Sequence, residues 1–166
     1  GDDCLFIMNH NYRSRDTMSH GDIEALMIAA KIVYEAKGRI TAAPFDKVRD
    51  AGQLTELCIG GSLGNERVRT HLENFFSEIS FNSESNDAHS LALIVGSDTF
   101  LCEQGINEYA VLAKFYPKAG LRPVFLISGQ TSNANKGAAW YLSENFDNLR
   151  RQYGQAQFCL ILKVKS

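Results

Sequence analysis

Three polar, glycine-containing segments of this sequence carry residue types that bind small anions. Each segment follows a short apolar run and precedes a helical pattern, so we expect three loops that each join a strand to a helix. Backbone N–H groups at the start of a helix have no partner within the helix and carry a partial positive charge. Because glycines let a ligand approach those groups, such loops are suited to phosphate, carboxylate or sulfate.

The candidate loops span residues 10–22, 60–70 and 128–136, and their candidate ligand-binding residues are glycines and hydrogen-bond donors. They are His10, Asn11, Arg13, Arg15, Gly60, Gly61, Ser62, Gly64, Asn65, Arg67, Gly129, Gln130, Thr131, Ser132, Asn133 and Lys136. The arginines could hold an anion through paired hydrogen bonds, and Lys136 could hold it as a point charge. Small polar residues also cap helices, so a purely structural role stays open for each loop.

Residues Gly60 to Gly64 also fit the pattern G-x-S-x-G, after an expected strand and before an expected helix. This segment resembles the nucleophile elbow of serine hydrolases. The resemblance implies that Ser62 attacks an acyl carbon and that the N–H of Leu63 joins the oxyanion hole. In that family an acid and then a histidine follow the serine, whereas only His71 and His89 follow Ser62 here. A serine hydrolase is therefore an alternative function with an incomplete triad.

Length and composition limit the class of protein. The chain has 166 residues, of which 45% are hydrophobic and 22% charged, with a net charge of −2. These values are typical of a folded globular domain and exclude disorder and a coiled coil. A duplex-DNA binder is usually more basic, and no apolar run approaches the ~20 residues of a membrane span. We expect one cytoplasmic domain over residues 1–166, excised from a longer protein, that binds neither nucleic acid nor membrane.

Cysteine spacing and glycine motifs give no sign of a metal or a cofactor. The four cysteines form no CxxC pair, and the four histidines are scattered, so a structural zinc site is not expected. The glycine-rich segments match neither a Walker A loop nor a GxGxxG fingerprint. The prediction is therefore a site with no metal and no cofactor.

Apolar runs and helical periodicity alternate along the chain. Runs at 4–9, 39–44, 54–59, 123–127 and 157–164 predict strands. Apolar residues at helical spacing predict helices after Ser19, after Asn65 and before Gly154. Between residues 77 and 117 the alternation of apolar and polar residues predicts antiparallel strands on an edge of the sheet, with 83–89 and 96–107 as loops. This edge is also a candidate surface for a homo-oligomer.

The order of elements predicts an α/β fold, namely a three-layer Rossmann-like mixed sheet with a mostly parallel core and antiparallel edge hairpins. In open parallel sheets ligands bind beyond the carboxyl ends of the strands, where the three loops should meet. The sequence therefore predicts a binding or sensor domain for a small anionic ligand of nucleotide type. The alternatives are the serine hydrolase with Ser62 and a non-catalytic interaction module that uses residues 77–117.

Overall fold

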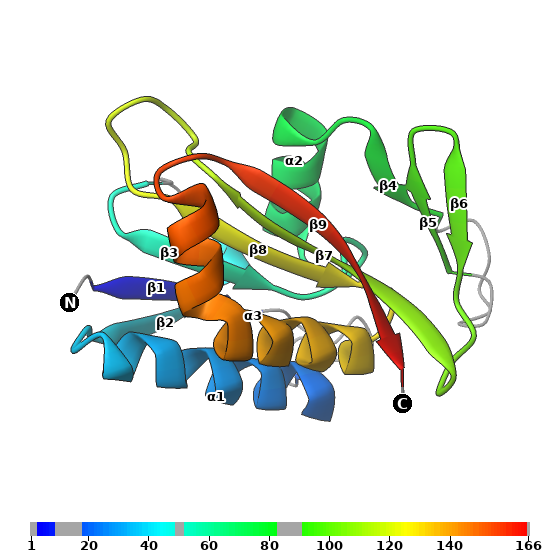
Figure 1. Ribbon diagram of the computed structural model, residues 1–166, viewed down its shortest axis with the longest axis horizontal. Coiled ribbons are helices and arrows are strands. Elements are labelled where there is room, and N and C mark those ends of the chain that lie inside the picture. The colour runs from blue at the N-terminus through cyan, green and yellow to red at the C-terminus, as the bar shows by residue number, and fades with distance from the viewer. Residues whose placement is uncertain (1–2, 9–17, 49–51, 83–90, 166) are drawn as a thin grey trace.

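The computed structural model describes residues 3–8, 18–48, 52–82 and 91–165, which form nine strands and three α-helices (Figure 1). In chain order they are β1 (Cys4–Met8), α1 (His20–Glu35), β2 (Ile40–Pro44), the 3-10 turn η1 (Phe45–Lys47), β3 (Thr55–Ile59), α2 (Glu66–Phe75), β4 (Ile79–Phe81), β5 (Ala92–Val95), β6 (Asp98–Leu101), β7 (Asn107–Phe115), β8 (Val124–Gly129), α3 (Ser132–Tyr153) and β9 (Phe158–Lys165). No helix in these ranges is long and apolar enough to cross a membrane.

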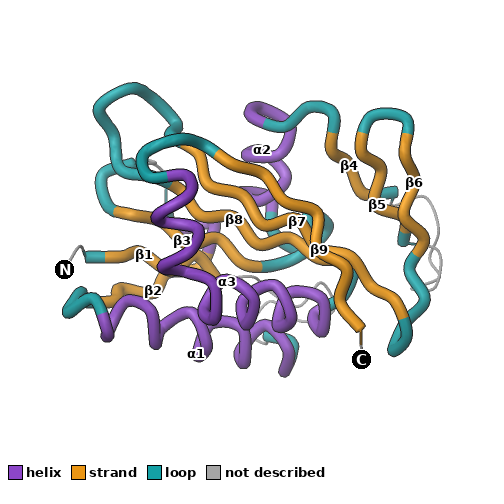
Figure 2. The backbone as a smooth tube through the Cα atoms, in the orientation of Figure 1, coloured by secondary structure: helices purple, strands orange, loops and turns teal. Residues whose placement is uncertain are grey.

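The main sheet has the strand order β2-β1-β3-β8-β7-β9 (Figure 2). The first four strands are parallel, whereas β7 is antiparallel to both of its neighbours. The apolar runs of β3 and β8 are buried almost throughout, as expected for strands that are covered on both faces. The prediction of an α/β fold with a mostly parallel sheet is confirmed.

Alternate residues of the strands face two separate cores, because successive side chains of a strand point to opposite faces. Phe6, Leu57 and Ile127 pack against α1 and α3, which lie side by side on one face (Figure 1). Ile7 and Cys58 face the other side, where α2 and the strands β4, β5 and β6 cover the sheet. The small alanines of α1 and α3 let these two helices approach each other and the sheet closely.

The prediction of antiparallel hairpins at an edge of the main sheet is wrong for residues 77–117. Strands β4, β5 and β6 form a separate antiparallel sheet, and β6 lies within the expected loop 96–107. Strand β7 is an interior strand, because β9 pairs with it from Asn107 to Lys114. Within this range, therefore, only β4 to β6 remain as a candidate surface for a partner.

The connections across the sheet also differ from a doubly wound fold. The units β1-α1-β2 and β8-α3-β9 each join two parallel strands, and both helices lie on the same face. The connection from β1 to β2 leads toward one edge of the sheet, and the connection from β8 to β9 leads toward the other edge. Because both helices cover the same face, the two crossovers have opposite handedness. Because almost all such crossovers are right-handed, one of the two is an exception. The expected Rossmann-like arrangement is thus not confirmed beyond its α/β class.

Helix α1 begins as the sequence predicts and ends differently. The side chain of Ser19 accepts a hydrogen bond from the N–H of Asp22 at 3.2 Å, which is the expected cap. At the other end Gly38 is the expected stop, yet Lys37 takes the left-handed conformation, with φ 58°. The N–H of Gly38 then bonds to the carbonyl of Val33 at 2.8 Å and closes the helix. A lysine therefore occupies the position that favours glycine.

We expect Lys37→Gly to raise the free energy of unfolding by about 0.5–1 kcal/mol, since glycine adopts positive φ without steric cost. Urea denaturation followed by circular dichroism measures the change. Lys31→Gly, at an exposed site within the same helix, should instead lower stability by about 1 kcal/mol. Equal losses in both variants would contradict the prediction.

Candidate functional site

The loops that follow β3 and β8 emerge side by side at one edge of the sheet. Strand β3 pairs in parallel with β8, from Glu56 opposite Val124 to Ile59 opposite Ile127. Strand β1 pairs in parallel with β3 on the other side. The carboxyl ends of all three strands therefore meet at this edge, which we call the carboxyl edge (Figure 1). The expectation that residues 60–70 and 128–136 begin at the same edge agrees with this strand order.

The turn after β3 rests against the end of β8. Gly60 has φ 141°, a conformation that disfavours side chains, and its N–H bonds to the carbonyl of Ile127 at 3.1 Å. A Cβ atom on Gly61 would lie 3.6 Å from the carbonyl oxygen of Gly129. The N–H groups of Gly64 and Asn65 both bond to the carbonyl of Gly61 and close the turn. The conformation of Gly60 therefore favours glycine, whereas the contact of Gly61 with Gly129 leaves room for a small side chain.

A buried hydrogen-bond network joins the start of α3 to the start of α1. The side-chain oxygen of Asn135 accepts a bond from the N–H of Gly129 at 2.6 Å, and its amide donates to Asp22 at 2.7 Å. Gly21 lies so close to α3 that a Cβ there would be 2.6 Å from the carbonyl oxygen of Ser132. The amino-terminal ends of α1 and α3 are therefore in direct contact.

Some backbone donors at this edge keep no acceptor. Among the residues that the structure describes, nothing accepts a hydrogen bond from the N–H groups of Ser62, Leu63 or Ser132. Ser62 and Leu63 belong to the turn after β3, and Ser132 is the first residue of α3. Unpaired N–H groups at adjacent turns need an acceptor from water or from a ligand. Backbone donors without an acceptor are the kind of group that binds anions in other proteins.

Several predicted ligand-binding side chains are used within the fold instead. Asn65 caps α2 and accepts from the N–H groups of Arg67 and Val68 at 3.1 and 3.2 Å. Thr131 caps α3 by accepting from the N–H of Ala134. These contacts are the capping roles that the sequence left open.

Gln130 and Lys136 have partners as well. The amide of Gln130 donates to the carbonyls of Leu91 and Phe100, which ties the small sheet to the end of β8. The ammonium of Lys136 lies 3.0 Å from Glu24. This hydrogen bond holds the pKa of Glu24 below its ordinary value. Of the third loop, Asn133 is exposed, and Thr131, Ser132 and Lys136 are partly exposed.

A buried carboxylate also occupies the start of α3. Glu108 is 1% exposed and accepts hydrogen bonds from the N–H of Gly105, the hydroxyl of Thr131 and the amide of Asn133. Its negative charge lies next to a positive helix end, which is favourable. Thr131 is therefore already bound to a carboxylate, in contrast to the amides of Ser62, Leu63 and Ser132 within the described residues.

Arg67, a candidate anion ligand, is a structural residue. Its side chain is 11% exposed and binds Glu56 through contacts of 2.9 to 3.1 Å, and it also donates to the carbonyl of Val48 at 3.0 Å. Burial opposes the ionisation of Glu56, but the neighbouring His71 and Arg67 outweigh burial and leave its pKa below the ordinary value. This pair was not predicted from the sequence, although a glutamate between the apolar residues of β3 is a signal for a buried partner.

The residues around Glu56 also bring together three possible metal ligands. Atoms of Glu56, Cys58 and His71 lie within 4.8 Å of one another. Burial and the charge of Glu56 raise the pKa of the Cys58 thiol, so it stays neutral, whereas a metal needs the thiolate. Arg67 already neutralises the Glu56 carboxylate. The group therefore fits a buried ion pair better than a metal site.

The serine of the G-x-S-x-G segment has no catalytic partner in the part of the chain that the structure describes. The side chain of Ser62 makes no hydrogen bond there. His71 is buried beside Glu56 and the ring of Phe115. Lys37 is the only described residue other than glycine with positive φ, so Ser62 lacks the strained backbone of a nucleophile elbow. The geometry adds nothing to the hydrolase interpretation.

Strand β1 ends at the carboxyl edge, and the first candidate loop follows it in the sequence. His10, Asn11, Arg13 and Arg15 lie outside the described residues, as does His89. Comparison with known protein families, curated proteins and solved structures finds no match to this chain. The function must therefore be inferred from the geometry of the chain alone.

Proposed function

We propose that this chain is a binding domain for a small anion of nucleotide type, and that the anion's phosphate binds at the carboxyl edge. The observation that carries the proposal is the set of unpaired N–H groups at Ser62, Leu63 and Ser132, on turns that follow two adjacent parallel strands. Backbone donors at helix starts bind phosphate because the helix dipole adds to their hydrogen bonds.

The arrangement of the helices supports the same conclusion. Helices α1 and α3 begin in contact with each other, as the approach of Gly21 to Ser132 shows, and α2 begins after the neighbouring turn. Ligand sites at the carboxyl ends of parallel strands are typical of open α/β sheets, and we propose that this sheet uses the same edge as Rossmann-like sheets do. We also propose the sensor role from the contact between Gly21 and Ser132. A ligand bound at Ser132 would touch the start of α3 and lie next to the start of α1, so its binding could shift both helices.

Two carboxylates near the proposed site, Glu108 and Asp22, affect how strongly an anion would bind there. Glu108 and Asp22 are buried and hydrogen-bonded, so each is already compensated by its neighbours. Their charges nevertheless weaken the attraction for a second anion. Binding should therefore depend on hydrogen bonds from the backbone more than on net charge.

Removal of one backbone donor tests the proposal. Proline is favoured at the first position of a helix, so Ser132→Pro should keep α3 while it eliminates the N–H of residue 132. The preceding Thr131 has φ −136° and ψ 168°, which a following proline tolerates. We expect adenosine monophosphate to bind this variant at least about fivefold more weakly, since hydrogen bonds to charged groups contribute about 1.5–3 kcal/mol.

Amide chemical shifts in a titration with adenosine monophosphate or inorganic phosphate locate the site. Shifts at Ser62, Leu63 and Ser132 support the proposal. The matched control Ser132→Ala removes only the hydroxyl and should bind as the unmodified chain does. Equal affinity of the proline and alanine variants, or shifts confined to other regions, would overturn the proposal.

A further inference from the structure

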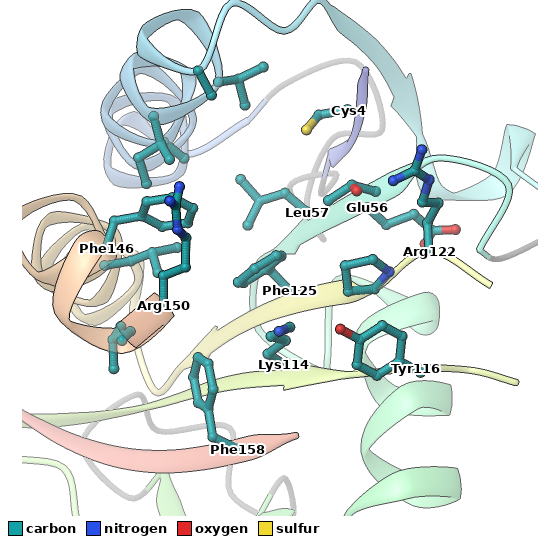
Figure 3. Close-up of a pocket in the computed structure, with 18 of the residues that line it drawn as sticks. Cys4, Glu56, Leu57, Lys114, Tyr116, Arg122, Phe125, Phe146, Arg150 and Phe158 are labelled. Carbon is teal, nitrogen blue, oxygen red and sulfur yellow. The ribbon is translucent and has the colours of Figure 1, made fainter. Parts of the chain in front are cut away.

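A cavity of about 350 Å³ lies at the opposite edge of the sheet from the proposed anion site (Figure 3). Its floor is formed where the parallel strands begin, at Cys4, Thr55 and Pro123. Its roof is formed by the carboxyl-terminal halves of α1 and α3. The volume is in the range of sites that enclose a small organic molecule.

The walls of this cavity are mainly apolar. Phe6, Leu57 and Phe125 come from the sheet, and Phe146 and Leu149 come from α3 (Figure 3). Such walls favour an apolar ligand body, because each Å² of apolar surface removed from water contributes about 25 cal/mol.

Lys114 lies within these apolar walls, and no described carboxylate pairs with it. It is 8% exposed, and its ammonium donates to the carbonyl of Gly154 at 2.5 Å and lies 5.4 Å from the ring of Tyr116. No carboxylate among the described residues forms a salt bridge with it. A buried charge is costly unless an opposite charge accompanies it. The ammonium has three protons to donate, and its hydrogen bond to the carbonyl of Gly154 uses one of them.

The other charged groups of the cavity add to this positive charge. Arg150 of α3 lines the cavity and forms no salt bridge within the described residues (Figure 3). Arg122 also lines the cavity, but it already interacts with another group of the chain. Among the described residues that line the cavity, Glu56 is the only one with a carboxylate, and Arg67 binds it at 2.9 Å. The cavity therefore combines apolar walls with an excess of cationic side chains.

We propose that this cavity binds an amphipathic carboxylate, such as a medium-chain fatty acid. The carboxylate binds Lys114 and Arg150, and the apolar chain lies between the sheet and helices α1 and α3. This site is separate from the proposed anion site, so either can fail without the other. Charge complementarity distinguishes such a ligand from a neutral lipid or a cationic amphiphile.

Titration calorimetry of the whole chain with decanoate tests the site, and decanol serves as the matched neutral ligand. We expect decanoate to bind at least about tenfold more tightly than decanol, because charged hydrogen bonds replace neutral ones. Equal affinities, or no binding of either compound, would overturn the proposal. Amide shifts on decanoate binding should appear at Lys114, Phe125 and Arg150, and shifts only at the carboxyl edge would also overturn it.

Two variants assign the binding to the cationic groups. Lys114→Met keeps an apolar stem of similar length, and Arg150→Gln changes an exposed side chain that the fold does not need. Each should weaken decanoate about tenfold and leave decanol unchanged. The control Lys163→Met removes a lysine that lies by Tyr109, on the other face of the sheet, and should have no effect. Equal losses in the control and in Arg150→Gln would contradict the assigned contacts.

Discussion

Replacement of Arg67 by methionine is expected to lower the free energy of unfolding by about 3–5 kcal/mol, since it leaves a buried carboxylate without its cation. Glu56 is 1% exposed, and Arg67 supplies its nearest positive charge at 2.9 Å. Guanidine denaturation measures the loss. The control Arg69→Met, on the same helix, removes an exposed arginine 3.6 Å from Glu66 and should change stability by less than about 1 kcal/mol.

The loss caused by Arg67→Met should depend on pH. The pKa of Glu56 in the folded chain lies below its ordinary value of 4.5, so the ion pair stabilises the fold above that pH. This stabilisation disappears as the pH falls through the lowered pKa, because the carboxyl becomes protonated. The difference between the variant and the unmodified chain should therefore shrink in acid. A difference that is constant with pH, or no larger than that of Arg69→Met, would contradict the ion pair.

Substitution of Gly21 by alanine is expected to destabilise the protein by about 1–3 kcal/mol, against the usual preference of helices for alanine. A Cβ at this position would lie 2.6 Å from the carbonyl oxygen and 2.7 Å from the carbonyl carbon of Ser132. Both atoms belong to the backbone of α3, so the clash is relieved only if α1 moves away. Thermal unfolding measures the change.

The control for Gly21→Ala is Met27→Ala, at a position of α1 that is 70% exposed. Its effect should stay within about 0.5 kcal/mol, as for most surface changes. A stabilising effect of Gly21→Ala would show that α1 and α3 do not approach each other as closely as described. Loss of phosphate binding together with stability would link this contact to the proposed site.

Local sequence signals predicted the ends of helices well. Ser19 caps α1, and Gly154, with φ 52°, ends α3, because both roles depend only on neighbouring residues. At the end of α1 the sequence predicted Gly38 as the residue that ends the helix, but the left-handed conformation occurs one position earlier, at Lys37. Strand β6 was missed because its sequence, Asp98-Thr-Phe-Leu101, is too short and polar to show alternation.

Features that depend on distant parts of the chain could not be predicted. The general behaviour of parallel strands predicted that the loops after β3 and β8 begin at the same edge, as the strand order has it. The contact of Arg67 with Glu56 could not be predicted, because Glu56 lies eleven positions away on another element. The cavity draws residues from β3, β7, β8, α1 and α3, and no local pattern marks it. Lys114 gave the nearest signal, as a lone charge in the apolar run of β7.

The contact between α1 and α3 has a consequence for how the chain folds as it is synthesised. Helix α1 lies near the start of the described chain, and its partner α3 spans residues Ser132–Tyr153. Strand β7 likewise cannot pair along its two edges until β8 and β9, which follow it in the chain, have been synthesised. The apolar face of α1 must therefore stay exposed while most of the chain leaves the ribosome. Contacts of such high sequence separation slow folding and prolong exposure to aggregation, so yield should depend on chaperones more than native stability suggests.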